Sequence, residues 1–195
     1  MRVLVACEFS GRVRDAFAKL GHDAWSCDIL PCESDMRVLN AQHFQCDVFG
    51  VIDNGWDMIV AHPPCTYLCN SGVRWLHTQE GRCDRMRKAA WFFLRLLEHR
   101  TKKIAIENPI MHKYAKEIIG RGQDQIIQPW QFGHGETKAT CLWLKGLPKL
   151  EPTNIVDGRE ARIHKMPPSK DRAKLRSTTF QGIADAMAEQ WGGAS

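Results

Sequence analysis

The sequence lacks the patterns that mark several common classes of protein. None of its apolar runs approaches the roughly 18 residues of a membrane-spanning helix, so we expect no membrane anchor. Its eight cysteines form no Cys-x2-Cys pair and accompany no His-x3-His pair, so a structural zinc site or any other metal centre is not expected. A Gly-x-Gly-x-x-Gly fingerprint is also missing, which argues against a phosphate-cradling dinucleotide site.

The opening segment, Met1-Arg-Val-Leu-Val-Ala6, runs directly into a strand-like pattern with no basic-then-apolar leader before it. We therefore expect a cytoplasmic protein whose thiols stay reduced. A length of 195 residues predicts one domain, 1–195, that buries its own core. The net charge of +5 is compatible with a nucleic acid or a phosphorylated substrate as partner.

Apolar runs alternate with segments that have apolar residues at helical spacing, which is typical of an α/β fold with a doubly wound, mostly parallel sheet. The predicted strands are 2–7, 24–28, 57–61 and 103–107, and the predicted helices are near 13–20, 84–100 and 180–191. Residues 125–128 and 140–144 predict a late antiparallel hairpin. Residues 145–176 are rich in proline and basic side chains, which predicts an irregular segment in contact with substrate.

The most informative motif is His62-Pro63-Pro64-Cys65, which directly follows a predicted strand. Two prolines stiffen the turn that presents the Cys65 thiol at the carboxyl end of the sheet, where open α/β sheets bind their ligands. Most buried cysteines act only as small apolar residues, but this position favours a nucleophile. Cys69 lies one helical turn further on and is a rival for the same role.

Glu107 ends the next predicted strand, within Lys103-Ile-Ala-Ile-Glu-Asn-Pro109. A buried carboxylate is costly unless it is hydrogen-bonded or has a raised pKa that suits proton transfer. Both interpretations stay open for Glu107 at this point. Asp28 ends the second predicted strand, about twenty residues after the first turn, where an acid can accept hydrogen bonds from the hydroxyls of a ribose.

The order of these motifs from residue 3 to residue 191 resembles the DNA cytosine-5 methyltransferases, and in particular small phage- and prophage-type members without a separate target-recognition domain. Glu8-Phe9-Ser10-Gly11 resembles the first cofactor loop of that family, and Asp28 its ribose-binding acid. Cys46-Asp47-Val48 resembles the Gly-Asp-Ile element, in which the acid binds the adenine amino group. Pro64-Cys65 matches the nucleophile motif, and Pro63 before it is expected to touch the cofactor.

Glu107-Asn108-Pro109 resembles the family's Glu-Asn-Val element, and Gly182-Ile-Ala-Asp-Ala186 its closing helix. The resemblance implies a Rossmann-like fold, S-adenosylmethionine as cofactor, and methylation of cytosine carbon 5 in DNA. Cys65 would attack carbon 6 of the base, and Glu107 would stabilise the charge at N3. Asn108 would contact the substrate. The location implied is the cytoplasm of a bacterial or phage-infected host cell.

The sequence departs from that family at several places. Thr66 stands where the family usually has glutamine, and the Gln-x-Arg-x-Arg element has only Glu136-Thr-Lys-Ala-Thr140 as its nearest match, from which Lys138 is expected to contact substrate. Target recognition would therefore depend on the short basic segment 145–176, on a separate partner or on a homodimer. The substrate is the least constrained part of the interpretation.

Three alternatives remain open from the residues. The His62-Pro63-Pro64-Cys65 frame is similar to the Asp-Pro-Pro-Tyr motif of exocyclic-amine methyltransferases, with Tyr67 two residues late. The carbon-5 chemistry would also serve a free pyrimidine nucleotide or RNA. The third alternative is a non-catalytic nucleic-acid-binding protein of prophage type.

Overall fold

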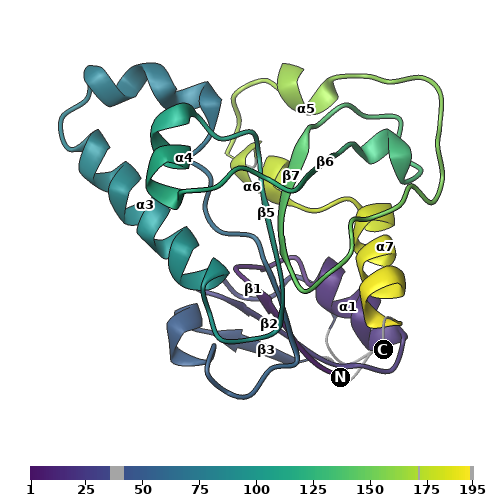
Figure 1. The fold of residues 1–195 in the computed structure, drawn as a ribbon. Helices are drawn as coiled ribbons and strands as arrows, with labels where there is room; N and C mark the ends of the chain where they lie inside the picture. The colour runs from purple at the N-terminus through teal and green to yellow at the C-terminus, as the bar shows by residue number, and fades with distance from the viewer. Residues whose placement is uncertain (36–41, 171, 194–195) are drawn as a thin grey trace.

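The computed structural model describes residues 1–35, 42–170 and 172–193. Its centre is a seven-stranded sheet with the order β3-β2-β1-β4-β5-β7-β6 (Figure 1). The first five strands are parallel, β7 is antiparallel to β5, and β6 is antiparallel to β7. The strands are β1 (Arg2–Ala6), β2 (Asp23–Asp28), β3 (Gln42–Gln45), β4 (Met58–Ala61), β5 (Lys103–Asn108), β6 (Gln125–Ile127) and β7 (Thr140–Lys145).

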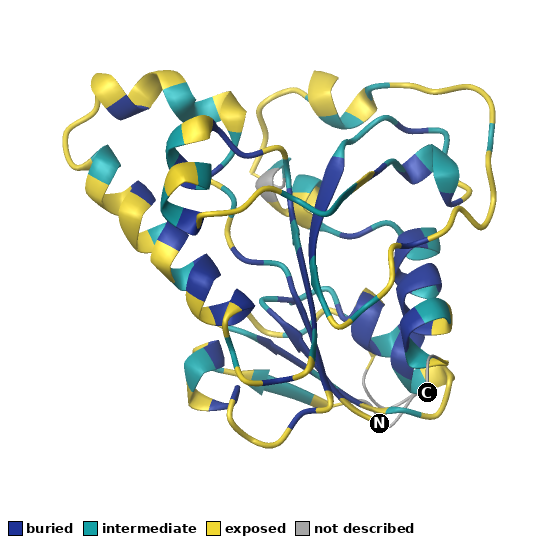
Figure 2. Cartoon of the chain, viewed as in Figure 1, coloured by how far each residue is buried: buried dark blue, intermediate teal, exposed yellow. Residues whose placement is uncertain are grey.

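Helices cover both faces of the sheet because the central strands are apolar on both sides. Leu4, Ile59 and Ile104 pack on the face covered by α3 (Arg82–Leu97) and α4 (Lys113–Ile119). Val3, Val5, Met58 and Val60 pack on the opposite face, against α1 (Arg12–Lys19) and α7 (Gln181–Gly192). Figure 2 shows the buried strands between these two layers of helices.

The remaining elements are short. They are the 3-10 helices η1 (Val48–Gly50), η2 (Asn70–His77) and η3 (Pro129–Gln131), and the helices α5 (Arg162–Lys165) and α6 (Arg172–Ser177). The segment between β7 and α5 is mostly exposed and forms the long outer loop at the upper right of Figure 2. Among the described residues, no helix has the length and apolar character needed to cross a membrane.

The expected α/β fold, with a mostly parallel sheet and a late antiparallel hairpin, is confirmed. One expectation was incomplete, because residues 145–176 contain α5 and α6 and are not irregular throughout. The sequence pattern also gave no sign of β3, whose residues Gln-His-Phe-Gln contain a single apolar side chain. This strand lies at the edge of the sheet, where pairing with β2 alone suffices and no apolar run is required.

Candidate active site

A large cavity of about 1540 Å³ opens at the carboxyl ends of the parallel strands. Its wall includes Cys7 after β1, Asp28 at the end of β2, Cys46 after β3 and His62 after β4. Open α/β sheets bind ligands in a crevice at the carboxyl ends of their strands, where the strands on either side of the first strand diverge in order. The cavity is larger than the roughly 300–1,000 Å³ typical of a single small-molecule site, so it can hold two ligands together.

The turn after β1 is shaped by Cys7 and Glu8. Cys7 has a φ of 59°, an uncommon value for a residue with a side chain, and this turns the chain sharply out of the strand. The buried Glu8 carboxylate then accepts hydrogen bonds from the backbone N–H groups of Val13 (2.7 Å) and Arg14 (3.2 Å). Burial raises the pKa of Glu8, and these two bonds oppose that rise.

The N-terminus of α1 is therefore filled by a carboxylate of the chain itself. In dinucleotide-binding folds the same position receives the phosphates of the cofactor. Phe9 lies in the cavity wall as expected, but Ser10 and Gly11 do not. The Ser10 hydroxyl donates to Glu8 (3.3 Å), and Gly11, with a φ of 72°, makes room for Arg14. Ser10 and Gly11 thus shape the turn, and their contact with a cofactor stays a prediction.

Three carboxylates lie in the wall on this side of the cavity: Asp28, Glu33 and Asp47. Asp28 Oδ1 accepts from the backbone N–H of Leu30 (2.9 Å), and Asp47 Oδ1 accepts from that of Phe49 (2.9 Å). Each aspartate therefore has a fixed orientation and keeps its second oxygen for a ligand. Val48, expected at the cofactor, also lies in this wall. We call this side, bounded by Asp28, Glu33 and Asp47, the acidic half.

The His62–Cys65 turn leaves β4 directly toward the cavity. Pro64 lines the cavity, whereas Pro63 is buried outside the wall. The backbone carbonyl of Pro63 accepts from Asn108 Nδ2 (2.9 Å). Asn108 is only 1% exposed and does not line the cavity. Asn108 thus fixes the turn to β5, and the contacts expected of Pro63 with a cofactor and of Asn108 with substrate stay predictions.

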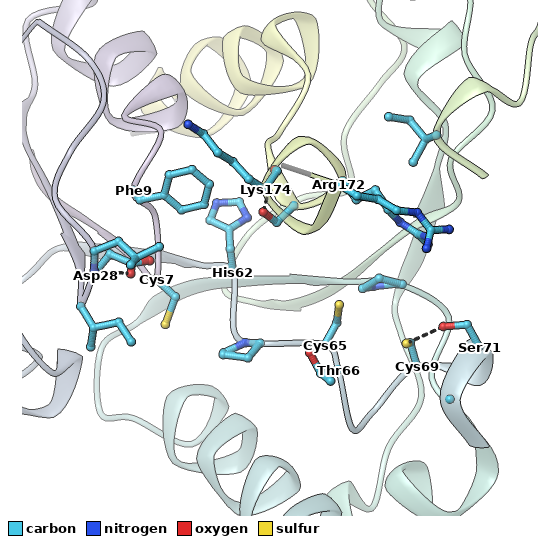
Figure 3. A pocket seen from close by; sticks show the side chains of 18 of the residues that line it. Cys7, Phe9, Asp28, His62, Cys65, Thr66, Cys69, Ser71, Arg172 and Lys174 are labelled. Carbon is cyan, nitrogen blue, oxygen red and sulfur yellow. Dashed lines mark hydrogen bonds between the residues drawn. The ribbon is translucent and has the colours of Figure 1, made fainter. Parts of the chain in front are cut away.

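Two thiols line the cavity beyond this turn (Figure 3). Cys65 lies between His62 and Cys69, with its thiol directed into the cavity. The neighbouring Cys69 and burial raise the pKa of Cys65, and the positive charge of Lys138 opposes the rise. Cys65 and the Ser71 hydroxyl, 3.1 Å from Cys69 Sγ, lower the pKa of Cys69 to about 5. In the free protein, Cys69 is therefore the more acidic thiol of the two.

Glu107 is paired with a residue that the sequence motifs did not assign to the site. Its Oε2 lies 2.9 Å from His62 Nδ1 and accepts from the Thr179 hydroxyl (3.2 Å). Burial would raise the pKa of Glu107, but the hydrogen bond and charge of His62 lower it to about 2. Burial would likewise lower the pKa of His62, but Glu107 and then Glu8 raise it. Each member of the pair therefore favours the charged form of the other.

The position of this pair changes the expectation for Glu107. Both side chains are 11% exposed, yet only His62 is part of the cavity wall. His62 Nε2 is buried and has no hydrogen-bond partner among the described residues. Of the two open interpretations, the hydrogen-bonded carboxylate with a lowered pKa is the one observed. His62 belongs to the motif that singled out Cys65, but the resemblance gave no role to a histidine there.

The cavity wall around and above the thiols is positively charged. Lys138, half-buried, lies here as expected. The other basic residues in this part of the wall are Arg82, His164, Lys170, Arg172, Lys174 and Arg176. We call this side the basic half; no acidic residue lies in its wall within the described ranges. Lys174 forms an ion pair with Glu33, which joins the basic half to the acidic half.

No protein-family model matches the sequence, and no curated protein matches it either. Among solved structures, the Entamoeba histolytica methyltransferase EhMeth is similar to this chain, with a TM-score of 0.48 at 15% sequence identity. The match covers 79% of this chain and 57% of that chain, so it spans little more than half of that protein. A likeness of this size does not indicate the reaction. The residues of the cavity are the basis for inferring the function.

Proposed function

We propose that this protein is an S-adenosylmethionine-dependent methyltransferase that acts on carbon 5 of cytosine in DNA, with Cys65 as the nucleophile. The observation that carries the proposal is the division of one cavity into two halves. One half has carboxylates at the ends of β2 and β3, and the other has the Cys65 thiol beside the His62–Glu107 pair and basic side chains.

The acidic half suits the proposed cofactor. S-adenosylmethionine has a sulfonium cation and no phosphate, and here the N-terminus of α1 is closed to phosphate by Glu8 while three carboxylates face the cavity. Asp28 would accept from the ribose hydroxyls, Asp47 from the adenine amino group, and Phe9 and Val48 would pack on the base. When bound, this cofactor supplies an activated methyl group. NAD-like cofactors fit poorly because their phosphates would meet Glu8.

Cys65 suits covalent catalysis because cytosine carbon 5 is a poor nucleophile. Addition of the Cys65 sulfur to carbon 6, with the thiol proton passing to solvent, places electron density on carbon 5. Carbon 5 would then take the methyl group, and loss of the carbon-5 proton together with expulsion of the thiolate would restore the ring. The positive charge of Lys138 favours the thiolate and opposes the rise in the pKa of Cys65.

The His62–Glu107 pair supplies a proton donor for the base. Addition of the thiolate increases the negative charge on N3 and O2 of the ring, and a positively charged hydrogen-bond donor stabilises this negative charge. Glu107 raises the pKa of His62, which favours its protonated form, and fixes the ring through Nδ1, so that Nε2 would be the atom that meets the base. A base at this atom would satisfy a buried donor that has no partner among the described residues.

The exocyclic-amine alternative has less support. That reaction needs an aromatic ring that stacks on the target base, and Tyr67 was the only candidate near the motif. Tyr67 does not line the cavity, and its ring lies beneath Arg82 and Arg85, at 5.2 and 5.7 Å from the two guanidinium carbons. Because Tyr67 lies outside the cavity wall, its ring is not presented to a base in the cavity.

The test is nucleoside mass spectrometry after the protein and S-adenosylmethionine are incubated separately with duplex DNA, single-stranded DNA, RNA and dCMP. We expect 5-methylcytosine from DNA, and none when Cys65 is replaced by serine. Formation of N4-methylcytosine or N6-methyladenine would overturn the carbon-5 assignment. Cofactor binding without product in any of the four tubes would point to an untested substrate or a missing recognition partner, whereas loss of cofactor binding would favour the non-catalytic alternative.

A further inference from the structure

Two arginines in the wall of the basic half have no carboxylate partner among the described residues. Two other arginines of this region do have such a partner, since Arg87 pairs with Asp84 (2.9 Å) and Arg162 with Glu136 (3.2 Å). Arg82 and Arg172 form no ion pair with any described residue. In both, Nε is buried and has no hydrogen-bond partner within the described ranges. A buried donor without a partner is costly, and a bound anion would satisfy it.

Arg82 approaches the nucleophile from the start of α3. Its Nη1 donates to Gln79 Oε1 (3.1 Å) and its Nη2 to the backbone carbonyl of Thr66 (3.4 Å), the residue after Cys65. Close packing over Gly72 also holds the guanidinium in place, because a Cβ on that residue would lie 2.6 Å from Nη2. Arg82 is therefore a fixed cation beside the thiol, and its hydrogen-bond partners here are neutral.

Arg172 comes from α6 and lines the same cavity. Figure 3 shows its side chain above the region of Cys65 and Cys69. The cavity that contains Cys65 is thus lined by two arginines from segments 90 residues apart in the sequence. Guanidinium groups bind phosphate through parallel hydrogen bonds, and a pair of them on either side of a reacting base matches a chain with a phosphate on each side of that base.

An aromatic side chain lies in the same wall. Trp75 in η2 is 37% exposed and lines the cavity, with the guanidinium carbon of Arg74 lying 4.4 Å from its ring centre. Proteins that bind single-stranded nucleic acid combine a basic groove with aromatic rings on which unpaired bases stack. In a duplex the faces of the bases are already stacked, and a ring such as Trp75 would have no base to receive.

We propose that the basic half binds a single-stranded polynucleotide, with Arg82 and Arg172 holding the phosphates on either side of the target base and Trp75 stacking on a neighbouring base. This inference rests on the proposed function for the identity of the target base, but the binding itself needs neither cofactor nor turnover.

The test measures binding by fluorescence anisotropy in the full chain with Cys65→Ser, which cannot react. Labelled strands of about 12 nucleotides are titrated as single-stranded DNA, single-stranded RNA and a DNA duplex, between about 50 and 200 mM salt. Arg82→Gln and Arg172→Gln are compared with Arg87→Gln, an exposed arginine of the same helix α3 whose partner is Asp84. Arg82→Lys and Arg172→Lys keep the charge and control for folding.

We expect each glutamine variant to reduce the slope of log K against log salt by about 0.7, the value for one phosphate contact on a single strand. The lysine variants should restore most of this slope, and Arg87→Gln should leave it unchanged. Binding of DNA and RNA strands with equal slopes supports recognition through phosphates, and a preference for one of them identifies the source.

Equal slopes in Arg82→Gln, Arg172→Gln and Arg87→Gln would overturn the proposal. Tighter binding of the duplex than of either single strand would overturn it too, and so would full displacement of the strand by dCMP at the concentration of the strand. If the wild-type chain methylates nothing but the slopes change as expected, the proposed function fails while this inference stands. If methylation occurs and the slopes do not change, the reverse holds.

Discussion

The acidic and basic halves of the cavity differ in how they are built, as well as in charge. The acidic half consists of residues that directly follow β1, β2 and β3, and backbone hydrogen bonds fix Asp28 and Asp47 there. The basic half takes most of its cations from α6 and the segment before it, far along the chain. A cationic cofactor and an anionic substrate would each find a complementary surface, and each would be repelled by the other half. If the proposed function holds, charge would direct the two ligands to different parts of one cavity.

The largest effect is expected on turnover in Cys65→Ser, which changes the proposed nucleophile in the basic half. A serine hydroxyl is a far weaker nucleophile at neutral pH, so turnover should be abolished while cofactor binding stays within a few-fold. Mass spectrometry of the product and calorimetry of cofactor binding measure the two separately. Cys83→Ser, which changes a half-buried thiol outside the wall, is the matched control. Undiminished methylation by Cys65→Ser would remove the central assignment.

The second effect is on the acidic half, from Asp28→Asn. The substitution removes a charged hydrogen-bond acceptor worth about 1.5–3 kcal/mol, so cofactor affinity should fall by roughly 10- to 100-fold. Binding of a DNA strand should stay unchanged, because Asp28 lies outside the basic half. Calorimetry with cofactor and anisotropy with the strand give both values. Loss of strand binding in this variant would show that the two halves do not act separately.

A smaller effect follows from the charges of the His62–Glu107 pair. The pKa of Glu107 is lowered to about 2, so its stabilising contribution is present above the unfolded pKa and is lost as the pH falls through the folded value. The pKa of His62 is raised, so its contribution is complete below the unfolded pKa and is lost as the pH rises through the folded value.

The stabilisation by the pair therefore spans the window between these two folded values. Urea unfolding of the wild type and of His62→Asn across this pH range measures it. The difference in unfolding free energy should be largest near pH 5 to 6 (about one unit below the usual pKa of histidine) and should shrink in alkaline solution. A difference that grows with pH would mean that His62 is neutral in the folded protein.

The smallest effect expected is on turnover in Cys69→Ser, which should be mild because Cys69 is not the nucleophile. The variant sharpens the comparison of the two thiols when combined with alkylation by iodoacetamide. With its pKa lowered to about 5, Cys69 should react at mildly acidic pH, where Cys65 stays protonated, and peptide mapping identifies the labelled residue. Complete loss of methylation in Cys69→Ser would reassign the nucleophile.

Much of the fold follows from the sequence because its central strands are buried on both faces. Val3–Ala6, Met58–Ala61 and Ile104–Ile106 are continuous apolar runs, and such runs identify parallel strands directly. The positions of Cys65 and Asp28 followed from the same reasoning, since each ends or directly follows such a strand. The edge strand β3 has no apolar run, so its sequence gives no comparable signal.

The sequence does not show which way a side chain faces, because tertiary contacts decide this. Ser10, Gly11, Pro63 and Asn108 are next to cavity residues in the sequence, but hydrogen bonds and packing turn them away from the cavity. The pairing of Glu107 with His62 joins residues 45 positions apart, on neighbouring strands β4 and β5. No spacing within one segment could reveal that contact or the pKa shifts that it causes in both groups.

The carboxylate of Glu8 at the start of α1 has a consequence for competition among ligands in a cell. Dinucleotides and nucleoside triphosphates carry the same adenosine unit that the proposed function assigns to Asp28 and Asp47, and an open helix N-terminus would attract their phosphates as well. Here the backbone N–H groups of Val13 and Arg14 are already occupied by Glu8. An adenosine ligand with a phosphate chain would meet repulsion where its phosphates normally bind, so we expect the abundant nucleotides to be poor inhibitors of the proposed site.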